Sequence, residues 1–303
     1  MSAPPALGVV VVCHDAEAVV GPCLGSLMAS QGAALDVVVV DNASRDATAA
    51  AVCAVRAPAP HRLRLVKAGR NGGFAAGVNL GLGALEHAPR VWLLNPDCTV
   101  PPGTAQRLAA HPEGFGLLGG RVLYEGSGRI QTDGGTLDRR TGRTRNVHQG
   151  APADAPAPDP AAMDFVTGAS LVASRAFLRR AGPMPEDYFL YYEEVAWARR
   201  RGDLALAHDP EAVVLHAAGH SIGSGRPDRE PSPLSLWFLH RSRQRFAARH
   251  FGARVVPRLW TLAKAAQALS WGRWTSAGVL ARVALGLPAP GSVRARVPPE
   301  ALR

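Results

Sequence analysis

Residues 36–44 read DVVVVDNAS, so four consecutive valines are followed at once by a polar turn. β-Branched residues favour strands, and an unbroken apolar run is typical of a strand buried on both faces, as in a parallel sheet. Similar apolar runs at 7–12 and 91–94 end in Cys13-His14-Asp15 and Asn95-Pro96-Asp97. These stretches predict parallel strands with polar residues at their carboxyl ends.

Between these strands the sequence alternates with helical segments. This rhythm predicts an α/β fold, a mainly parallel sheet flanked by helices on both faces. Ligands bind at the carboxyl ends of the strands in such sheets. The expected strands are 7–12, 36–40, 64–66 and 91–94, and the expected helices are 16–30, 46–55 and 75–86.

After residue 100 the alternation is lost. We expect a Pro/Ala-rich flexible loop at 150–162, either a lid over a substrate or a tolerated insertion. Ser174 is expected to cap a helix. The other expected strands are 115–123, 130–137, 165–173 and 212–216, and the expected helices are 174–181, 193–201, 232–250 and 257–287.

The chain has 303 residues, of which 47% are hydrophobic and 19% charged, which excludes a wholly disordered chain. Its basic excess lies in residues 226–303, which hold 14 Lys and Arg but three acids. A basic segment of this kind binds nucleic acid, anionic lipid or an acidic partner. No nucleic-acid recognition motif accompanies the charge, so nucleic acid is not expected as a partner.

The cysteines and the N-terminus indicate the compartment. The four cysteines fit no zinc-binding spacing, which favours a reduced, cytoplasmic setting without disulfides. The N-terminal residues lack the basic flank and the cleavage site of a signal peptide, and no segment is expected to span a membrane.

Two aspartates at strand ends are candidate ligands. Asp41 can accept hydrogen bonds from a ribose or a base, or it can simply close an Asx turn. Asp97 follows Pro96, which stiffens the turn, and it offers the oxygen ligand that a divalent ion on a diphosphate needs. The alternative for Asp97 is an ordinary turn. The glycine-rich loop 71–81 permits close approach of a ligand to the backbone.

Two further candidates lie later in the chain. Glu193 and Glu194 follow an aromatic run, and aromatic walls raise the pKa of a carboxyl towards the range of a general base. The same pair could instead cap a helix. His216 ends an apolar strand, where it could ligate a metal, contact a diphosphate or be an ordinary core histidine.

Taken in order, these motifs resemble the family 2 glycosyltransferases of the GT-A fold. The branch that they are most similar to is the rhamnosyltransferases acting on polyprenyl-diphosphate-linked sugars. The resemblance covers roughly residues 7–250. The motifs that carry it are DNAS at 41–44, NGGFAAGVNLG at 71–81, LNPD at 94–97, TGA at 167–169, FLYYE at 189–193, HAAGHS at 216–221 and RSR at 241–243.

The resemblance implies roles for particular residues. Asp97 and His216 would hold Mg²⁺ or Mn²⁺, and Glu194 and Glu193 would be catalytic, with Glu194 as the base. Residues 1–225 would form the GT-A catalytic domain, with a nucleotide-binding half at 1–100 and an acceptor half at 101–225, and 226–303 a basic helical extension. The residues expected to contact the nucleotide-sugar are His14, Asp15, Asp41, Asn71, Gly73, Asn79 and Asn95.

The sequence departs from the family pattern at three places. Cys13-His14-Asp15 replaces the usual Thr-Tyr-Asn, which puts the nucleobase contacts in question. Glu194 stands where the family has its aspartate base, and Ala196 replaces a second aspartate. Pro185 replaces another aspartate, so the role of that carboxylate is lost or taken over by a neighbour.

The resulting expectation is an inverting glycosyltransferase. The resemblance favours dTDP-rhamnose as donor and a polyprenyl-diphosphate-linked saccharide of the cell envelope as acceptor. The basic C-terminal helices, with Trp260, Trp271 and Trp274, fit an anionic membrane, so the cytoplasmic protein is expected to lie peripherally at the inner face of the cell membrane. Alternatives are a natural-product glycosyltransferase, a nucleotidyltransferase and an inert sugar-nucleotide-binding scaffold.

Overall fold

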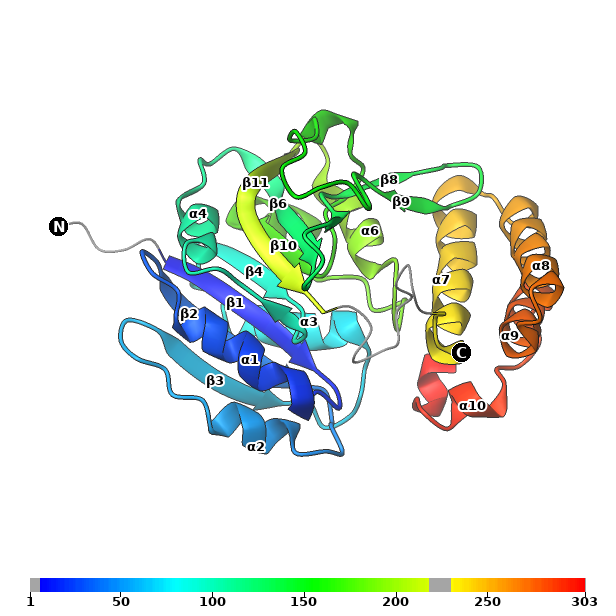
Figure 1. Cartoon of the computed structure of the whole chain (residues 1–303), viewed down its shortest axis with the longest axis horizontal. Helices are drawn as coiled ribbons and strands as arrows, with labels where there is room; N and C mark the ends of the chain where they lie inside the picture. Colours follow the sequence, from blue (N-terminus) through cyan, green and yellow to red (C-terminus); the bar gives the residue numbers. More distant parts are fainter. Residues whose placement is uncertain (1–5, 218–229, 303) are drawn as a thin grey trace.

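The computed structural model describes residues 6–217 and 230–302, and it has the expected α/β architecture (Figure 1). One half of the sheet is entirely parallel, and its strand order is β3 (Arg62–Lys67), β2 (Ala34–Asp41), β1 (Ala6–Cys13), β4 (Arg90–Leu94). It continues through β10 (Ser170–Ser174), β6 (Phe115–Tyr124), β11 (Ala205–His216) and β5 (Cys98–Thr99). Strand β11 is parallel to β6, whereas β10 and β5 run antiparallel to their neighbours. The predicted mainly parallel sheet is confirmed.

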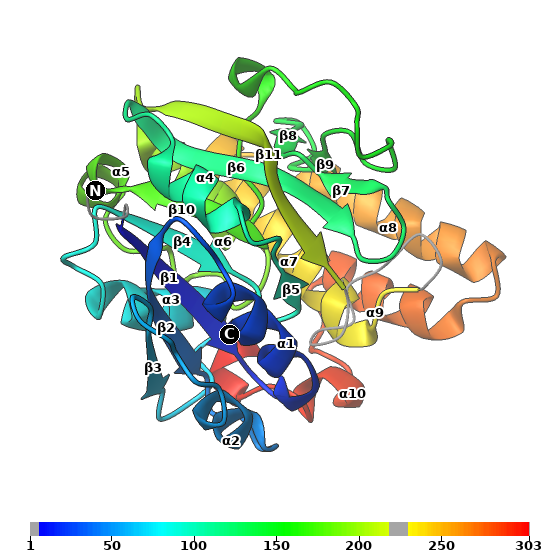
Figure 2. The same ribbon diagram turned by 60° about the vertical axis from the view of Figure 1, so that its left-hand side comes forward.

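Helices cover both faces of the sheet (Figure 2). Strand β1 shows why, because Val9 and Val11 belong to one buried core and Val10 and Val12 to the other. The uninterrupted valine run is therefore buried on both sides, as expected for a central parallel strand. The helices of the first core are α1 (Glu17–Met28), α2 (Thr48–Cys53) and α4 (Thr104–Ala110), and those of the second are α3 (Phe74–Gly83), α5 (Arg175–Ala181) and α6 (Glu193–Ala198).

The C-terminal part is helical. It consists of α7 (Pro233–Phe251), α8 (Val255–Ser270), α9 (Trp274–Leu285), α10 (Gly291–Arg294) and the 3₁₀ helix η3 (Pro299–Leu302). Helix α7 has contacts on both sides, since Phe246 packs in the sheet's core while Trp237 and Phe238 belong to a third core with α9. The division after residue 225 stays a prediction. Within the described residues, no helix has both the length and the apolar character needed to cross a membrane.

Several expected elements differ from the structure, three of them in kind or number. The single helix expected at 257–287 is wrong, because Gly272 adopts φ +70° and separates α8 from α9. The strand expected at 130–137 is two short strands, β7 (Ile130–Thr132) and β8 (Gly135–Leu137), and Gly134 turns between them at φ +133°. The strand expected at 165–173 is confined to β10.

The loop at 150–162 is tied to the sheet. The guanidinium of the buried Arg121 donates to both carboxylate oxygens of Asp133 at 3.0 and 2.8 Å, and to the carbonyl of Ala153 at 2.6 Å. A second carbonyl, that of Pro156, accepts at 3.3 Å. The expected flexibility is thus limited by a buried ion pair that fixes the first half of the loop.

Candidate active site

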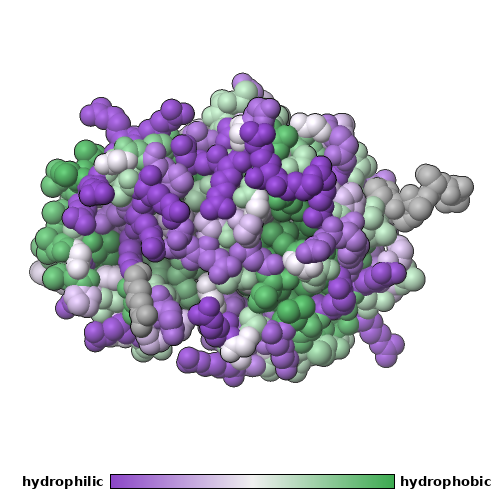
Figure 3. Space-filling view, turned by 180° about the vertical axis from the view of Figure 1, so that it is seen from behind, coloured by the Kyte–Doolittle hydropathy of each residue, from purple (hydrophilic) through white to green (hydrophobic). Residues whose placement is uncertain are grey.

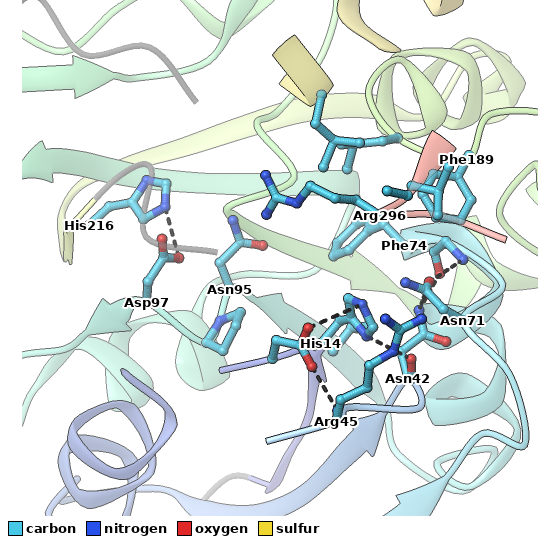
Figure 4. Close-up of a pocket in the computed structure, with 18 residues that line it drawn as sticks. His14, Asn42, Arg45, Asn71, Phe74, Asn95, Asp97, Phe189, His216 and Arg296 are labelled. Atoms are coloured by element: carbon cyan, nitrogen blue, oxygen red, sulfur yellow. Dashed lines mark hydrogen bonds and ion pairs between the residues drawn. The ribbon is translucent and has the colours of Figure 1, made fainter. Parts of the chain in front are cut away.

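A pocket of about 240 Å³ opens at the carboxyl ends of β1, β2 and β4, which we call the donor pocket (Figure 4). Seven of the predicted site residues line it, and they come from four separate parts of the chain. They are His14, Asp15, Asn71, Gly73, Asn95, Asp97 and His216. The parallel topology accounts for this meeting, because the strands present their ends at one edge of the sheet.

The loop before α3 is held in the donor pocket by a pair of asparagines. The side-chain amide of Asn42 donates to Asn71 Oδ1 at 3.1 Å and to the Gly73 carbonyl at 2.9 Å. In return, Asn42 Oδ1 accepts from the Gly72 N–H at 3.2 Å, and Asn71 Oδ1 accepts from the Gly73 N–H at 3.0 Å. Because the whole amide of Asn42 and the Oδ1 atom of Asn71 are engaged in this way, the two side chains shape the pocket wall.

Gly73 is required by geometry. Its φ is +88°, and a Cβ atom there would lie 2.4 Å from the Phe189 carbonyl oxygen. We expect Gly73→Ala to lower the free energy of unfolding by about 2–4 kcal/mol, because strain at positive φ adds to a backbone clash. Urea denaturation measures this, with Gly69→Ala as the control, since a Cβ there meets nothing within 4 Å. Equal stability of the two variants would contradict the close approach of the loops.

The loops after β1 and β2 are joined through Asp15. Its Oδ1 accepts from the Arg45 N–H at 2.7 Å, while the Ser44 hydroxyl accepts from the Asp15 N–H at 3.0 Å. Asp15 has φ +50°, a backbone conformation that costs of order 1–3 kcal/mol. The hydrogen bonds to Arg45 and Ser44 help to hold it. His14 Nδ1 lies 3.1 Å from the Asn42 carbonyl, and its Nε2 lies 3.7 Å from Asp15 Oδ2. His14 and Asp15 thus lie in a turn that these hydrogen bonds hold in place.

Two residues expected to contact the nucleotide-sugar are not among those lining the pocket. Asp41 is buried, and its Oδ1 accepts from the Ser44 N–H at 2.9 Å, which is the Asx-turn alternative. The Asn79 amide donates to the Met184 carbonyl at 3.0 Å and to Glu186 at 2.8 Å, and Asn79 Oδ1 accepts from the Met184 N–H at 2.8 Å. In this conformation both side chains hold neighbouring turns in place.

Asp97 and His216 fit a divalent cation. Asp97 Oδ1 and His216 Nε2 are 3.0 Å apart, which is about the spacing of two adjacent ligands around one ion at 2.1 Å from each. On the other side of the ring, Gln131 Oε1 lies 2.8 Å from Nδ1. When Gln131 accepts the Nδ1 proton, Nε2 is the nitrogen left to bind an ion.

A third group near this pair does not suit such an ion. Potential ligand atoms of Asp97, Cys98 and His216 lie within 4.8 Å of one another. Burial raises the pKa of the Cys98 thiol well above its usual value, and its sulfur donates towards the Ala169 carbonyl at 3.7 Å. A thiol is a soft ligand that hard cations do not prefer, whereas Asp97 and His216 offer an oxygen and an imidazole nitrogen, a combination that suits Mn²⁺ or Mg²⁺ with further oxygen ligands.

A second cavity, of about 340 Å³, adjoins the first, and we call it the acceptor cavity. It is lined by Glu193 and Glu194, by the aromatic residues before them and by Gln131. Asn95 and His216 line both cavities, so the two spaces meet beside the candidate ion site.

The glutamate pair is positioned by an unusual backbone. Tyr191 and Tyr192, directly before α6, have φ values of +66° and +74°. Their hydroxyls hold this turn, since Tyr192 donates to the Gly142 carbonyl at 2.7 Å and Tyr191 lies 2.8 Å from the Ser235 hydroxyl. Two successive left-handed residues cost of order 1–3 kcal/mol each, and such costs concentrate at functional sites.

The carboxyl groups of Glu193 and Glu194 are largely shielded from solvent. Among the described residues, Oε2 of Glu193 and Oε2 of Glu194 have no hydrogen-bond partner. Burial raises the pKa of Glu193 well above its usual value, and the charge of Glu194 raises it further. Burial also raises the pKa of Glu194, although backbone amides partly offset the effect. One carboxyl of such a pair is suited to take a proton near neutral pH.

The raised pKa of Glu193 has a consequence for stability. The folded protein binds the Glu193 proton more tightly than the unfolded chain, so the stability of the wild type falls as pH rises between the two pKa values. We expect Glu193→Gln to unfold at higher denaturant concentration than wild type at pH 8, with the difference shrinking towards pH 4. Glu86→Gln, at an exposed position, is the control. A pH-independent difference would contradict the assignment.

Several residues that line the two cavities are not predicted from the sequence. Asn42 lies within a quoted motif, so its proximity to Asp41 was a usable signal. Gln131, Arg45 and Arg296 carry no local motif, and only the folded chain brings them to the site. Of the departures noted above, Ala196 is buried in the sheet's core rather than exposed in the acceptor cavity. Gly219 and Ser221 lie outside the described residues.

The N-terminal half of the chain is similar to a known protein family. Residues 8–151 match the family model described as Glycosyl transferase family 2. The succinoglycan biosynthesis protein ExoO of Rhizobium meliloti (strain 1021) is 30% identical over 133 residues, which are 44% of this chain and 36% of that protein. The chain therefore spans about a third of the length of this curated relative.

Solved structures resemble the chain over more of its length. The mannosyltransferase PcManGT from Pyrobaculum calidifontis, in complex with GDP-Man and Mn²⁺, has a TM-score of 0.55 at 19% identity, covering 92% of this chain and 75% of that one. S. aureus TarS 1-349 in complex with UDP-GlcNAc has a TM-score of 0.56 at 16% identity, covering 96% and 83%. At these identities the likeness shows the fold. Residues 8–151 are therefore similar to glycosyl transferase family 2, and the described part of the chain has a GT-A fold.

Proposed function

We propose that the chain is a metal-dependent, inverting glycosyltransferase that moves a sugar from a nucleoside diphosphate to an acceptor hydroxyl. The observation that carries the proposal is the meeting of two cavities at Asn95 and His216. The donor side holds an ion-binding pair, Asp97 and His216, and the acceptor side holds the two glutamates with unpartnered oxygens. A single displacement needs these two functions on opposite sides of the anomeric carbon.

The chemistry assigns one task to each side. An ion held by Asp97 and His216 would supply positive charge to the leaving diphosphate. Glu194 removes the proton from the acceptor hydroxyl while the new bond from that oxygen to the anomeric carbon forms and the bond to the diphosphate breaks. Attack from the opposite face inverts the anomeric configuration, and no covalent sugar–enzyme intermediate is formed. Burial and the charge of Glu194 raise the pKa of the adjacent Glu193, which favours a single negative charge on the pair.

We favour dTDP-rhamnose as donor and a polyprenyl-diphosphate-linked saccharide as acceptor. The choice of rhamnose rests on the sequence motifs. The likeness to a succinoglycan biosynthesis protein supports a role in polysaccharide synthesis. The similar structures are complexes with GDP-Man and UDP-GlcNAc, so the donor test includes these sugars.

Transfer of labelled sugar tests the proposal. The protein is incubated with labelled dTDP-rhamnose, GDP-mannose or UDP-GlcNAc, Mn²⁺ and a bacterial lipid-linked saccharide fraction. We expect label in the lipid fraction for one donor. Transfer only to a small aglycone would indicate a natural-product enzyme. Pyrophosphate release from a nucleoside triphosphate would indicate a nucleotidyltransferase. Donor binding without turnover would indicate an inert scaffold, and these three outcomes contradict the proposal.

A peripheral membrane position fits the surface of α8 and α9. Among the described residues, eight of the nine exposed large hydrophobic side chains lie between residues 255 and 287, including Trp271 at 60% exposure and Trp274 at 72%. Figure 3 shows hydrophobic surface over the C-terminal helices, at the left edge of that view, beside hydrophilic surface. The exposed arginines 254, 258, 273 and 282 lie in the same stretch. Exposed tryptophans among basic side chains favour an anionic lipid surface.

Trp260 differs from the other two tryptophans. Its ring is half-buried and is covered by the cations of Arg243 at 4.1 Å, Lys264 at 5.2 Å and Arg143 at 5.6 Å. It packs between helices and is not part of the exposed surface. We therefore restrict the proposed membrane contact to Trp271, Trp274 and the apolar residues around them.

Vesicle binding tests this surface. We expect the double variant Trp271→Ala/Trp274→Ala to bind vesicles with 30% phosphatidylglycerol at least about 10-fold more weakly than wild type, because two large apolar side chains no longer leave water. Flotation measures the bound fraction. Leu80→Ala removes an exposed hydrophobic residue outside α8 and α9 and is the control. Equal binding by wild type, double variant and control would contradict the membrane surface.

A further inference from the structure

The end of the chain forms one wall of the donor pocket. After α9, residues 290–302, which we call the C-terminal segment, return towards the sheet, and Ala295, Arg296 and Val297 line the pocket. Figure 4 shows Arg296 entering from this segment, on the side of the pocket away from His14 and Asn42. A segment far along the chain thus faces the ends of the N-terminal strands.

The C-terminal segment is anchored by packing. Val293 and Val297 are buried in the core that includes Leu190 and residues of α7. Close to the chain's end, Arg241 of α7 donates to the Ala301 carbonyl at 3.1 Å. Val293 and Val297, which flank Arg296 in the sequence, therefore fix the segment by their burial, and its position does not depend on the arginine side chain.

The guanidinium of Arg296 is unpaired and accessible. Its backbone N–H donates to the Val293 carbonyl at 3.1 Å, and its side chain lines the donor pocket. Within residues 6–217 and 230–302, the Arg296 guanidinium has no hydrogen-bond or ion-pair partner, and the residue is exposed. An arginine that is placed in a pocket by buried neighbours and makes no internal pair is available to a ligand.

The charges of the donor pocket define the ligand. A nucleoside diphosphate brings about two negative charges, and the pocket already holds the carboxylates of Asp15 and Asp97. An ion at Asp97 offsets only part of this charge. Two arginines line the pocket, Arg45 from the loop after β2 and Arg296 from the opposite end of the chain. A guanidinium binds phosphate oxygens in a bidentate manner and is the group best suited to this task.

We propose that Arg296 binds the diphosphate of the sugar donor, so that the C-terminal segment completes the donor site. This inference rests on the proposed function, because it requires that the pocket receive a nucleoside diphosphate. The inference goes beyond the proposed function, because it assigns a donor contact to a part of the chain outside residues 8–151, which match the family 2 model.

Calorimetric titration tests the contact. UDP, GDP and dTDP are titrated, each with MnCl₂, into wild type, Arg296→Ala, Arg296→Lys and Arg294→Ala. Arg294 is an exposed arginine of the same segment that is not among the lining residues, so its removal is the matched control. For the nucleotide that wild type prefers, we expect Arg296→Ala to lower the affinity about 10- to 100-fold and Arg296→Lys to lower it less. The affinity for the corresponding nucleoside, which lacks phosphates, should stay within 2-fold.

The outcomes separate the two proposals. If wild type binds none of the three nucleotides, the proposed function and this inference both fail. If wild type binds one of them, and Arg296→Ala binds it as tightly as Arg294→Ala does, this inference fails while the proposed function stands. An equal loss for nucleotide and nucleoside would show a collapsed pocket instead of a phosphate contact, and would also overturn it. Unchanged melting temperatures without ligand show that the variants are folded.

Discussion

Glu194→Gln is expected to lower kcat for sugar transfer by about 10²–10⁴-fold, the contribution of a positioned general base. The amide has nearly the shape of the carboxylate but cannot accept the proton of the acceptor hydroxyl. The affinity for the nucleoside diphosphate should be unchanged, because Glu194 lines the acceptor cavity and not the donor pocket. Initial rates of nucleotide release with acceptor, together with calorimetric titration of the nucleotide, measure both quantities.

The control for this variant is Glu86→Gln, which makes the same change at an exposed position. Burial raises the pKa of Glu194, so the wild-type rate should fall as pH drops through a value above that of an ordinary glutamate. Full activity of Glu194→Gln would rule out its role as base. A joint loss of rate and nucleotide affinity would show that the glutamate supports the fold of the pocket instead.

Asp97→Asn should have an effect of similar size on the donor side. The variant loses the charged oxygen that lies 3.0 Å from His216 Nε2, and an amide oxygen is a much weaker ligand for a hard divalent ion. We expect Mn²⁺-dependent transfer to fall by at least about 10³-fold, since charge stabilisation of the leaving group by an ion contributes several kcal/mol. Electron paramagnetic resonance of Mn²⁺ with the nucleoside diphosphate present measures the loss of binding.

Asp203→Asn is the matched control for the metal site. Asp203 is a surface carboxylate with a side chain that is 86% exposed and pairs with Arg180. It should bind Mn²⁺ and transfer sugar as wild type does. Wild-type Mn²⁺ affinity in Asp97→Asn, together with normal activity, would mean that the ion, if required, is held elsewhere.

The sheet could be predicted because its signal is local. A valine run such as 37–40 has few alternatives to a buried strand, and polar residues at the ends of parallel strands necessarily face one edge. That reasoning placed His14, Asp97 and the loop around Gly73 correctly at one pocket. The pairing of Asp97 with His216 required the order of the family's motifs, because no local spacing joins residues so distant in sequence.

Other features depended on tertiary packing. The break at Gly272 was missed because a single glycine does not end a helical pattern by itself, whereas the packing of α8 against α9 requires a reversal there. The hydrogen bond from the Asn79 amide to the Met184 carbonyl joins two segments that are distant in sequence and meet only in the folded chain. No sequence pattern distinguishes Arg296 from the other arginines of its basic segment. Only the fold, which brings this segment to the pocket, shows that it lines the donor site.

We propose above all that the donor pocket binds a nucleoside diphosphate together with a divalent ion. The most direct measurement is the melting temperature of the wild-type protein with UDP, GDP, dTDP or CDP, each with and without Mn²⁺. A ligand that binds only the folded state raises this temperature by mass action. We predict a rise for one nucleotide that requires Mn²⁺ and is lost in Asp97→Asn. No rise with any nucleotide, or a rise that is equal with and without Mn²⁺, would contradict the account.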